Sequence, residues 1–548
     1  MKKYSIGVDF GTLSARAALI DLDDGREVSL CELVYPHAIL NGTDVSGVNT
    51  TENSEMQLQH PQDYLDALSH TVKGVLADSQ VSPDAIVGIG LDFTACTMLP
   101  IDADGTPLCF LEKYKNEPHA YAKLWKHHGA QKEADEITLL AQNEKESWLD
   151  IYGGKISSEW LFPKIYETLN KAPNVFDDAH RFIEAGDWIV LMLTGQESHS
   201  SCMAGYKGLW NKKDGYPKND FWAKLDTRLS DIVGTKVSEN VLPTGTKAGV
   251  VDSKGALLTG LCEGTAVAVP IIDAHAALPS AGISDAGKLM LIIGTSSCHI
   301  VMSKDGANVP DICGSVQDGV IAGLCAHEAG QAGVGDSFDW FVKNCVPEDY
   351  AAKARESGLS IFSYLDKKAS EKGIGESGLV ALDWFNGNRT PYSDADLSGV
   401  IVGLTLNTKP EDIYRAILES TAFGTKSIVD IYEKNGVCVD EVYAAGGISR
   451  KNEFLMQMYS DVLGKKIKVT SSTQAAAKGS AIFASVAGGH FDNAKSAVAA
   501  LSDGIAKIYE PNLNNTEKYK KLYDAYLSLS QYFAKASNIM KSLKSRGE

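Results

Sequence analysis

The sequence contains little that would attach the protein to a membrane or suit it to an oxidising environment. No apolar run is long enough to cross a bilayer, and the N-terminus reaches Asp9 without the apolar stretch of a signal peptide. The ten cysteines include no C-x-x-C pair and no Cys/His cluster with zinc-finger spacing. We therefore expect scattered reduced thiols, a reducing compartment and a cytoplasmic protein.

Positive charge is scarce as well. Lysine and arginine number 52 against 70 aspartate and glutamate residues, so the formal net charge is −18. Such a surface repels the phosphate backbone of nucleic acids and anionic lipids, and we exclude both as partners. Local basic pockets can still bind a small phosphate compound, so a nucleotide is not excluded.

The common nucleotide and zinc motifs are missing too. No G-x-x-x-x-G-K-[ST] stretch occurs, so a bound ATP cannot use a Walker loop. Residues 373–378 match G-x-G-x-x-G, but they follow charged residues rather than an apolar strand, and we interpret them as a loop. His327-Glu328 begins like a zinc-protease motif, but Gln331 stands where the second histidine would be needed.

What the chain does contain is one order of elements that occurs twice within its 548 residues. Apolar runs and helical spacing predict, in the first half, strands over 4–9, 15–20 and 27–34, a helix over 61–76 and a strand over 86–91. In the second half they predict strands over 289–293, 299–302 and 320–326, helices over 410–432, 452–463 and 474–486, and strands over 441–445 and 467–470. This repetition indicates an α/β protein of two lobes.

We place the lobe boundary after residue 283, which gives an N-terminal lobe of residues 1–283 and a C-terminal lobe of residues 284–548. Residues 93–240 hold many Trp and Tyr side chains and are interpreted as an elaboration of the first lobe. The stretch 519–543 places an aromatic stripe on one helical face. We favour a helix packed across its own protein over a partner-binding helix, because most such stripes belong to a core.

Two glycine-threonine turns occupy equivalent places in the two lobes. Gly11-Thr12 follows the first strand of the first lobe, and Gly294-Thr295 follows the first strand of the second. Glycine permits close backbone approach to an anion, and threonine offers a hydroxyl. A third element, Gly446-Gly447, lies between a strand and a helix, where a flat ring could approach the backbone. Together these elements indicate a phosphate-binding turn from each lobe and an adenosine pocket.

In this arrangement the chain resembles the superfamily of actin, the heat-shock chaperone ATPases and the sugar kinases. Within it, the chain resembles the FGGY carbohydrate kinases over essentially its full length: residues 399–404 and 412–419 fit that family's C-terminal signature. The other family signature expects a Lys-x-Trp core, which residues 156–164 do not strictly match. The resemblance implies the two-lobed actin-like (ribonuclease H-like) ATPase fold, with duplicated mixed sheets, helices on both faces and a central cleft.

Longer segments resemble the members of that family that phosphorylate ribulose. They are residues 90–97 (GLDFTACT), 152–160 (YGGKISSEW), 204–207 (AGYK), 328–331 (EAGQ) and 382–391 (LDWFNGNRTP). The resemblance implies transfer of a phosphoryl group from ATP to the 5-hydroxyl of ribulose in pentose (arabinose) catabolism, with L-ribulose favoured over D-ribulose.

The catalytic residue implied by the resemblance is Asp273, which follows an apolar strand and accepts the proton of the sugar hydroxyl. Without the family it would be interpreted as a helix N-cap. His275 is expected to be structural. Asp9, at the end of the first strand, can hold a hydrated Mg²⁺, with Asp273 as a second ligand through water.

The same resemblance implies that Ala95, Lys207 and Glu328 line the sugar pocket together with Asp273. Lysine donates to hydroxyl groups and glutamate accepts from them, which suits a polyol. Glu328 alone would be interpreted as a surface carboxylate.

Two residues are implied on the nucleotide side. Arg16 helps to hold phosphate. Without the family, Arg16 would be interpreted as a solvated residue at a strand end. Asn452 reaches the adenosine. Without the family, Asn452 would be interpreted as a helix N-cap. Lys451 is a weaker candidate for the contact with adenosine.

Two other functions stay open at this point. A different FGGY kinase, for ribitol or xylulose, would need only a few changes in the sugar pocket. An actin-like or chaperone-type ATPase would bind protein, but the sequence after the two lobes holds one helix and a short charged tail instead of a peptide-binding domain. The expected partners are a sugar and ATP; the oligomeric state is open, a homodimer included.

Overall fold

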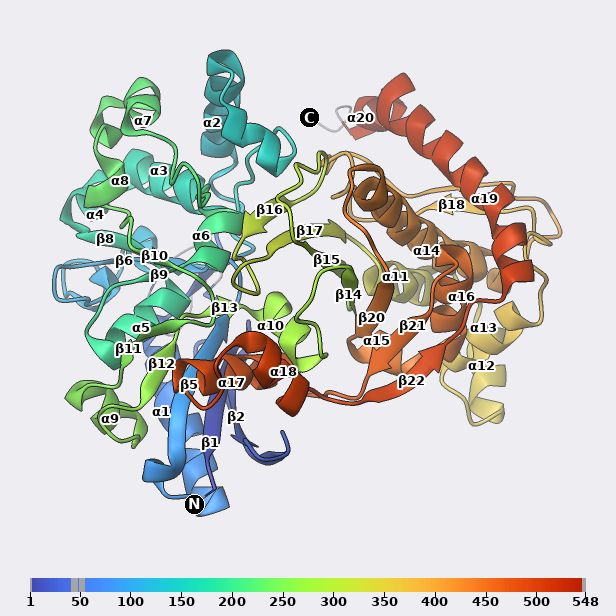
Figure 1. Ribbon diagram of the computed structural model, residues 1–548. Coiled ribbons are helices and arrows are strands. Elements are labelled where there is room, and N and C mark those ends of the chain that lie inside the picture. Colours follow the sequence, from blue (N-terminus) through green and yellow to red (C-terminus); the bar gives the residue numbers. More distant parts are fainter. Residues whose placement is uncertain (1, 41–47, 49–54, 545–548) are drawn as a thin grey trace.

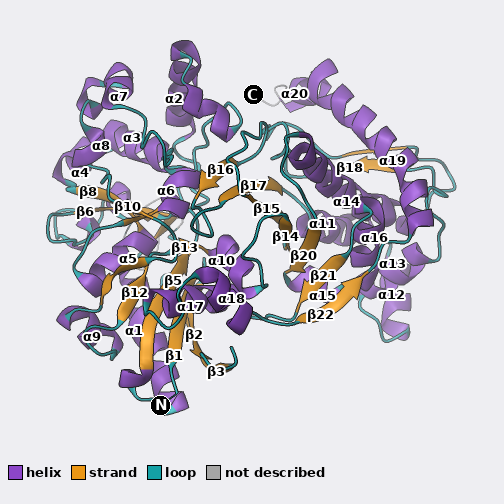
Figure 2. Ribbon diagram, viewed as in Figure 1, coloured by secondary structure: helices purple, strands orange, loops and turns teal. Residues whose placement is uncertain are grey.

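The computed structural model describes residues 2–40, 48 and 55–544, and it has two lobes side by side (Figure 1). Each lobe is built on a seven-stranded mixed sheet with helices against it (Figure 2). The first sheet has the spatial order β11 (Lys247–Val250), β12 (Ala266–Ala268), β5 (Ile86–Phe93), β1 (Tyr4–Phe10), β2 (Ser14–Asp21) and β3 (Glu27–Val34), with β13 (Ile271–Ile272) beside the end of β5.

Helices cover both faces of the first sheet. On one face, α1 (Pro61–Ser79) places the Tyr64 ring against Phe93, with 5.0 Å between ring centroids. On the other face, α17 (Ala475–Ala487) comes from the second half of the chain and receives a hydrogen bond from Ser5 Oγ to the Ala481 carbonyl. Helix α10 (Asp273–Ser280) packs beside α17.

The second sheet has the spatial order β16 (Gly314–Gln317), β17 (Cys325–Gln331), β15 (Ser297–Ser303), β14 (Lys288–Ile293), β20 (Glu441–Ala445), β21 (Ile467–Thr470) and β22 (Ile505–Tyr509). One face packs against α14 (Pro410–Lys434) and α16 (Glu453–Leu463). From the other face, Met290, Ile300 and Tyr443 enter the core of the first lobe. The two lobes therefore share a hydrophobic core.

Residues between β5 and β11 form the predicted elaboration of the first lobe, and one strand from before β5 joins its sheet. Its core is aromatic, with Phe162 stacked on Trp222 at 4.2 Å between ring centroids. Its elements are a sheet of β4 (Leu58–Gln59), β7 (Ala122–Lys123), β6 (Met98–Ile101) and β8 (Arg181–Glu184), with the helices α2 (Gln131–Glu144), α3 (Leu161–Lys171), α4 (Pro173–Asp178), α5 (Ala185–Thr194), α6 (Ser201–Lys207), α7 (Asn219–Leu225) and α8 (Ile232–Thr235).

The other elements complete the two lobes. They are α9 (Ser253–Thr259), α11 (Gly335–Cys345), α12 (Glu348–Glu356), α13 (Ile361–Ser370), α15 (Gly447–Lys451), α18 (Ala494–Leu501), α19 (Leu513–Gln531) and α20 (Ile539–Lys544), with the strand pairs β9 (His199–Ser200) and β10 (Val241–Leu242), and β18 (Val380–Leu382) and β19 (Val400–Val402). Across the described ranges, no helix combines the length and apolar character that a bilayer crossing requires.

Most of the predicted elements are confirmed, and one is wrong. The predicted strand over 320–326 contributes only Cys325 and Ala326 to a strand, because the chain forms β16 and β17 around a turn. Val320 and Ile321 of that turn are apolar because their side chains are buried in the shared core. Strand β17 carries His327, Glu328 and Gln331, and these polar residues hide its strand character in the sequence.

Two further expectations are confirmed. Residues 373–378 lie in turns outside any helix or strand. The aromatic stripe of the C-terminal segment packs on its own protein, since Tyr519 and Tyr526 of α19 are buried in the core of the second lobe.

Helix α17 approaches the first sheet at backbone distance, which requires glycine on the sheet. A Cβ atom would lie 1.7 Å from the Ala477 carbonyl oxygen at Gly7, 2.4 Å from that of Ala484 at Gly88, and 2.1 Å from that of Ser480 at Gly90. Real Cβ atoms do not come so close to backbone, so these three glycines fix the depth of α17 against β1 and β5.

We predict that Gly90→Ala destabilises the protein by about 2–3 kcal/mol, because the added methyl group pushes α17 off the sheet. Gly306→Ala is the matched control, since the nearest atom to its Cβ lies 4.0 Å away. Thermal melting compares the two variants. Equal melting temperatures would show that α17 does not depend on this contact.

Candidate active site

Three carboxyl groups line up at neighbouring strand ends of the first sheet. In the parallel register of β1 and β5, Asp9 lies opposite Asp92, and Asp92 lies opposite Ile271 of β13. Asp273 follows β13 directly and begins α10. The Asp92 Oδ2 atom accepts a 2.6 Å hydrogen bond from Ser480 Oγ on α17. This carboxylate row is Asp9, Asp92 and Asp273.

Burial and mutual repulsion keep protons on this row. Burial raises the pKa of Asp92 well above its ordinary value, and the charge of Asp9 raises it further. Burial also raises the pKa of Asp9, although Asp92 and Arg16 oppose the change. For Asp273, burial and then the charge of Asp9 raise the pKa to about 7. A carboxyl with that pKa can take up or release a proton at neutral pH.

The first glycine-threonine turn lies beside this row. Gly11 N donates to Ser14 O at 3.0 Å, which closes the β1–β2 hairpin. Residues from the elaboration hold Thr12: Trp125 Nε1 donates to its hydroxyl at 3.1 Å, and Gln59 Nε2 donates to its carbonyl at 2.6 Å. The sequence analysis did not identify either contact, because both partners are remote in sequence.

Arg16 of β2 lies between acidic residues on the two neighbouring strands, β1 and β3. Its Nη1 atom is 3.8 Å from Asp9 Oδ2, and its Nε atom is 3.2 Å from Glu32 Oε1. The guanidinium group is therefore held next to Asp9, where it can also meet an anion.

The second glycine-threonine turn adjoins the predicted adenosine glycines. Parallel pairing of β14 with β20 sets Ile292 opposite Ala445, so the residues that follow each strand are neighbours. At Gly446, φ is 101° and a Cβ atom would lie 2.3 Å from the Ile293 carbonyl oxygen, so only glycine fits. Gly447 has open space above it. Gly294-Thr295 and Gly446-Gly447 thus share one edge of the second sheet.

Loops lock this edge in place. The Thr295 carbonyl accepts a hydrogen bond from Val334 N at 2.8 Å. Asn452 caps α16 by accepting from Leu455 N at 2.8 Å, and its Nδ2 donates to Asp366 Oδ1 at 3.1 Å. Both functional ends of Asn452 are therefore engaged within the protein. Lys451 ends α15 and is exposed.

The predicted sugar residues come together where the lobes meet. Lys207, the last residue of α6, has its Nζ 4.0 Å from Glu328 Oε1 on β17 of the second sheet. His275 Nε2 lies 3.2 Å from Glu328 Oε2. Burial would raise the pKa of Glu328, but Lys207 and then His275 hold it down to about 2. Glu328 is one of the charges that act on Asp273, which links this pair to the carboxylate row.

Ala95 lies on the same side, in the turn that follows β5. Residues 91–94 and 96–100 are buried, whereas Ala95 itself is partly exposed. Because Asp92 lies near the end of the same strand, three residues earlier, the turn lies beside the carboxylate row.

Three residues near this site were not predicted as part of it. Asp92 ended a predicted strand, but only the parallel pairing with β1 shows that it meets Asp9. Tyr206 Oη donates to the Ala326 carbonyl at 2.8 Å and ties α6 to β17. Arg389 lies over Gly330, where a Cβ atom would be 3.1 Å from its Cδ. Its guanidinium is among the charges that lower the pKa of Glu328.

Two surface hollows lie away from this site. One of about 620 Å³ lies between α1 and β3, lined by Leu33, Asp66 and His70 among others. Another of about 270 Å³ lies where α16 and α19 meet, lined in part by Arg415 and Phe454. Chemistry rather than size therefore identifies the candidate site. No recorded contact among the described residues joins the two glycine-threonine turns, so their joint grip on one triphosphate stays a prediction.

Comparisons with known proteins agree over nearly the whole chain. Residues 4–279 match the N-terminal domain, and residues 289–488 the C-terminal domain, of the FGGY family of carbohydrate kinases. A protein from Bacillus licheniformis named ribulokinase is 46% identical over 97% of both chains. Another from Geobacillus thermodenitrificans with the same name is 45% identical over 99% of this chain and 97% of its own.

Solved structures show the same fold. A xylulose kinase from Rhodospirillum rubrum superimposes with a TM-score of 0.81, at 22% identity over 96% of this chain and 98% of its own. A gluconate kinase from Lactobacillus acidophilus gives a TM-score of 0.79, at 18% identity over 98% and 99%. The two-lobed actin-like fold is thereby confirmed.

The raised pKa of Asp273 predicts a pH-dependent change in stability. Between an unfolded value of 3.8 and a folded value of about 7, the folded protein holds a proton that the unfolded chain releases. Ionised Asp273 therefore destabilises the fold as the pH rises, by at most about 4 kcal/mol at pH 8. We expect Asp273→Asn to raise the melting temperature at pH 8 and to raise it by less at pH 5, where the loss of stability above pH 3.8 has only begun.

Asp104→Asn, on an exposed turn, serves as the control and is expected to shift melting equally at both pH values. If Asp273→Asn also shifted melting equally at both, its carboxyl would not carry the raised pKa.

Proposed function

The chain belongs to the FGGY family of carbohydrate kinases, and on that premise we propose that it transfers the γ-phosphoryl group of ATP to ribulose. The products are ribulose 5-phosphate and ADP, with L-ribulose preferred over D-ribulose. Relatives named ribulokinase that align over nearly their full lengths support the choice of sugar. The observation that carries the chemistry is a carboxyl with a pKa of about 7, Asp273, beside the pair of the buried Glu328 and the partly exposed Lys207.

Asp273 acts as the general base in this proposal. Phosphoryl transfer needs an in-line hydroxyl, a group that takes its proton, and stabilisation of the charge on the phosphoryl oxygens. A base with a pKa near the working pH is ionised often enough to accept the proton and basic enough to hold it. Asp273 takes the proton of the terminal sugar hydroxyl as the oxygen attacks the γ-phosphorus.

Lys207, Glu328 and Ala95 hold the sugar. The ammonium group of Lys207 donates to hydroxyl or carbonyl oxygens, and the carboxylate of Glu328 accepts from hydroxyl groups. The low pKa of Glu328 keeps it ionised, so it acts as an acceptor throughout. Ala95 offers a small surface in the turn after β5, which leaves room for the sugar.

The glycine turns hold the nucleotide. Gly11 and Thr12 bind phosphate from the first lobe, with Arg16 beside them, and Gly294 and Thr295 bind it from the second. The open space above Gly447, next to the constrained Gly446, accommodates the adenosine. Asn452 contributes on that side by shaping the start of α16, because both of its polar ends are engaged.

Magnesium fits the carboxylate row. Mg²⁺ prefers oxygen ligands and usually keeps several waters while it binds one or two carboxylates and the phosphates. Within the described part of the chain, no three His, Cys, Asp or Glu groups are arranged to hold a metal ion by themselves. This agrees with an ion that arrives with ATP. Asp9 would bind it directly and Asp273 through water, and the ion would neutralise charge on the phosphates.

A cytoplasmic location is part of the same proposal. All ten cysteines are free thiols, which suits a reducing compartment. A homodimer is compatible with this function and is not required by it.

We predict that a coupled assay for ADP release ranks the sugars with L-ribulose first. Its kcat/KM should exceed those for xylulose, ribitol and glycerol by at least about 10-fold, because buried polar groups such as Lys207 and Glu328 reject a mismatched hydroxyl pattern. D-ribulose tests the stereochemical preference in the same assay. An equal or higher kcat/KM with xylulose or ribitol would contradict the proposed substrate.

Asp273→Asn is expected to lower kcat by a factor on the order of 10²–10⁴, since the amide cannot accept the hydroxyl proton. The measurement is steady-state turnover with saturating L-ribulose and ATP, with Asp104→Asn as the control. Turnover at the wild-type rate in a correctly folded Asp273→Asn protein would remove Asp273 from the role of base.

A further inference from the structure

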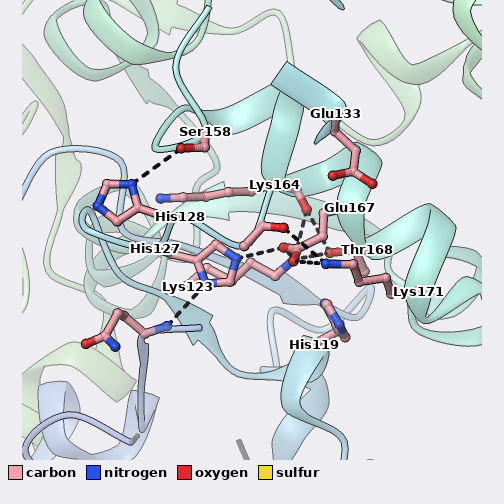
Figure 3. A network of polar contacts seen from close by, with 12 residues as sticks. His119, Lys123, His127, His128, Glu133, Ser158, Lys164, Glu167, Thr168 and Lys171 are labelled. Carbon is pink, nitrogen blue, oxygen red and sulfur yellow. Dashed lines mark hydrogen bonds and ion pairs between the residues drawn. The ribbon is translucent and has the colours of Figure 1, made fainter. Parts of the chain in front are cut away.

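A lysine whose ammonium group donates to backbone carbonyls is buried inside the elaboration of the first lobe. Lys164 of α3 is fully inaccessible to solvent, and its ammonium group donates to the carbonyls of Cys96 at 2.7 Å and Leu124 at 2.9 Å. Within the described ranges Lys164 forms no direct ion pair, and the carboxyl groups that act on its charge, Glu159 and Glu184 among them, do so from a longer distance. Figure 3 shows its side chain within a network of buried polar groups on α3 and the neighbouring strand.

The next buried lysine in that network is arranged differently. Lys123 Nζ donates to Glu167 Oε2 at 2.7 Å and to Thr168 Oγ1 at 2.8 Å, so its charge is compensated. Glu167 in turn contacts His127 Nε2 at 2.7 Å. Lys123 therefore forms a buried ion pair of the usual structural kind. The ammonium group of Lys164 is instead hydrogen-bonded to two backbone carbonyls.

Burying an unpaired ammonium group costs free energy that an apolar side chain of similar length would avoid. Burial accordingly lowers the pKa of Lys164. A residue that opposes local stability in this way is best explained by what it holds in position.

Lys164 holds the turn that follows β5. Cys96 adopts a left-handed backbone conformation with φ of 49°, uncommon for a residue other than glycine, and its carbonyl is the one that Lys164 binds. The ends of the turn are joined by a 2.7 Å hydrogen bond between the Thr94 and Thr97 hydroxyl groups. Ala185 N also donates to the Thr97 carbonyl at 2.7 Å.

This geometry presents one residue to the site. With Thr94, Cys96 and Thr97 buried and tied from behind, Ala95 is the only partly exposed residue of the turn. A left-handed residue relaxes readily to an ordinary conformation once its carbonyl is released. Such a change at Cys96 would move the Ala95 peptide group relative to the carboxylate row.

We propose that Lys164 is a positioning residue of the sugar site: its buried ammonium group holds the Cys96 carbonyl and thereby sets the Ala95 turn against the bound sugar. The inference rests on the proposed function, because it assigns Ala95 to the sugar. Lys164 does not touch substrate, and its bond to the Cys96 carbonyl acts on the sugar side. Its other acceptor, the Leu124 carbonyl, precedes Trp125, which donates to Thr12 of the first nucleotide turn. That turn is also closed by the hydrogen bond from Gly11 N to Ser14 O and held by Gln59.

Lys164→Met tests this assignment, since methionine keeps most of the length and loses the donors. We expect the KM for the sugar to rise on the order of 10-fold, because small misplacements of a binding group are costly, while the KM for ATP changes by less than about 2-fold. Lys164→Arg, which restores donors and charge, should recover most of the sugar affinity.

Lys123→Met is the matched control. It removes an equally buried lysine of the same network that donates to Glu167, Thr168 and the Lys164 carbonyl but to no residue of the turn, so it perturbs α3 and leaves the bond from Lys164 to Cys96 in place. It should lower the melting temperature and leave both KM values within about 2-fold of wild type. If Lys164→Met does not fold, Lys164→Gln takes its place, with the same expected split between sugar and ATP.

Two results would overturn the inference while the proposed function stands: an unchanged sugar KM in Lys164→Met, or an equal rise in Lys123→Met. Wild-type protein that phosphorylates none of the sugars would instead overturn the proposed function and this assignment with it.

Discussion

The parallel pairing of β5 with its neighbours is the constraint on which the site depends. It sets Asp9, Asp92 and Asp273 side by side at one sheet edge, under cover of α17. Carboxyl groups so close together and so poorly solvated cannot all ionise, so the row retains protons and the pKa of Asp273 moves to about 7. The proton-accepting capacity of the site thus comes from the sheet, because an isolated aspartate would be a much weaker base.

The shared core of the two lobes supplies the other half of the site. Strand β17 belongs to the second sheet, yet Tyr206 of the first lobe bonds to its backbone and Lys207 pairs with Glu328. A polyol pocket needs donors and acceptors that stay charged away from water, and pairing across the lobe junction provides them. The lobes are therefore joined on the sugar side, whereas the nucleotide turns belong to separate sheets.

Close backbone packing and a buried charge both occur where they hold elements of the site in position. Helix α17 can lie against the strands whose ends carry the carboxylates because three positions on those strands lack a side chain. These positions are Gly7, Gly88 and Gly90. The ammonium group of Lys164 is removed from water and binds the Cys96 carbonyl in the turn that follows β5. Each of these choices opposes local stability. Gly7 and Gly90 precede Asp9 and Asp92 of the carboxylate row by two residues, and Lys164 lies behind the turn that carries Ala95. Such conflicts between local preference and global fold are expected at functional sites.

By itself, the sequence determined the class of fold, most element boundaries, the two glycine-threonine turns and the family, because apolar periodicity and turn residues act over short distances along the chain. It missed β17, whose Glu328 faces the lobe junction while His327 and Gln331 contact the second lobe, and it could not show that Asp92 belongs with Asp9. Tertiary structure alone decided those pairings, the pKa of Asp273 and the contact of Lys164 with Cys96. These depend on which strands become neighbours and how deeply they are buried, and such long-range facts leave no local pattern.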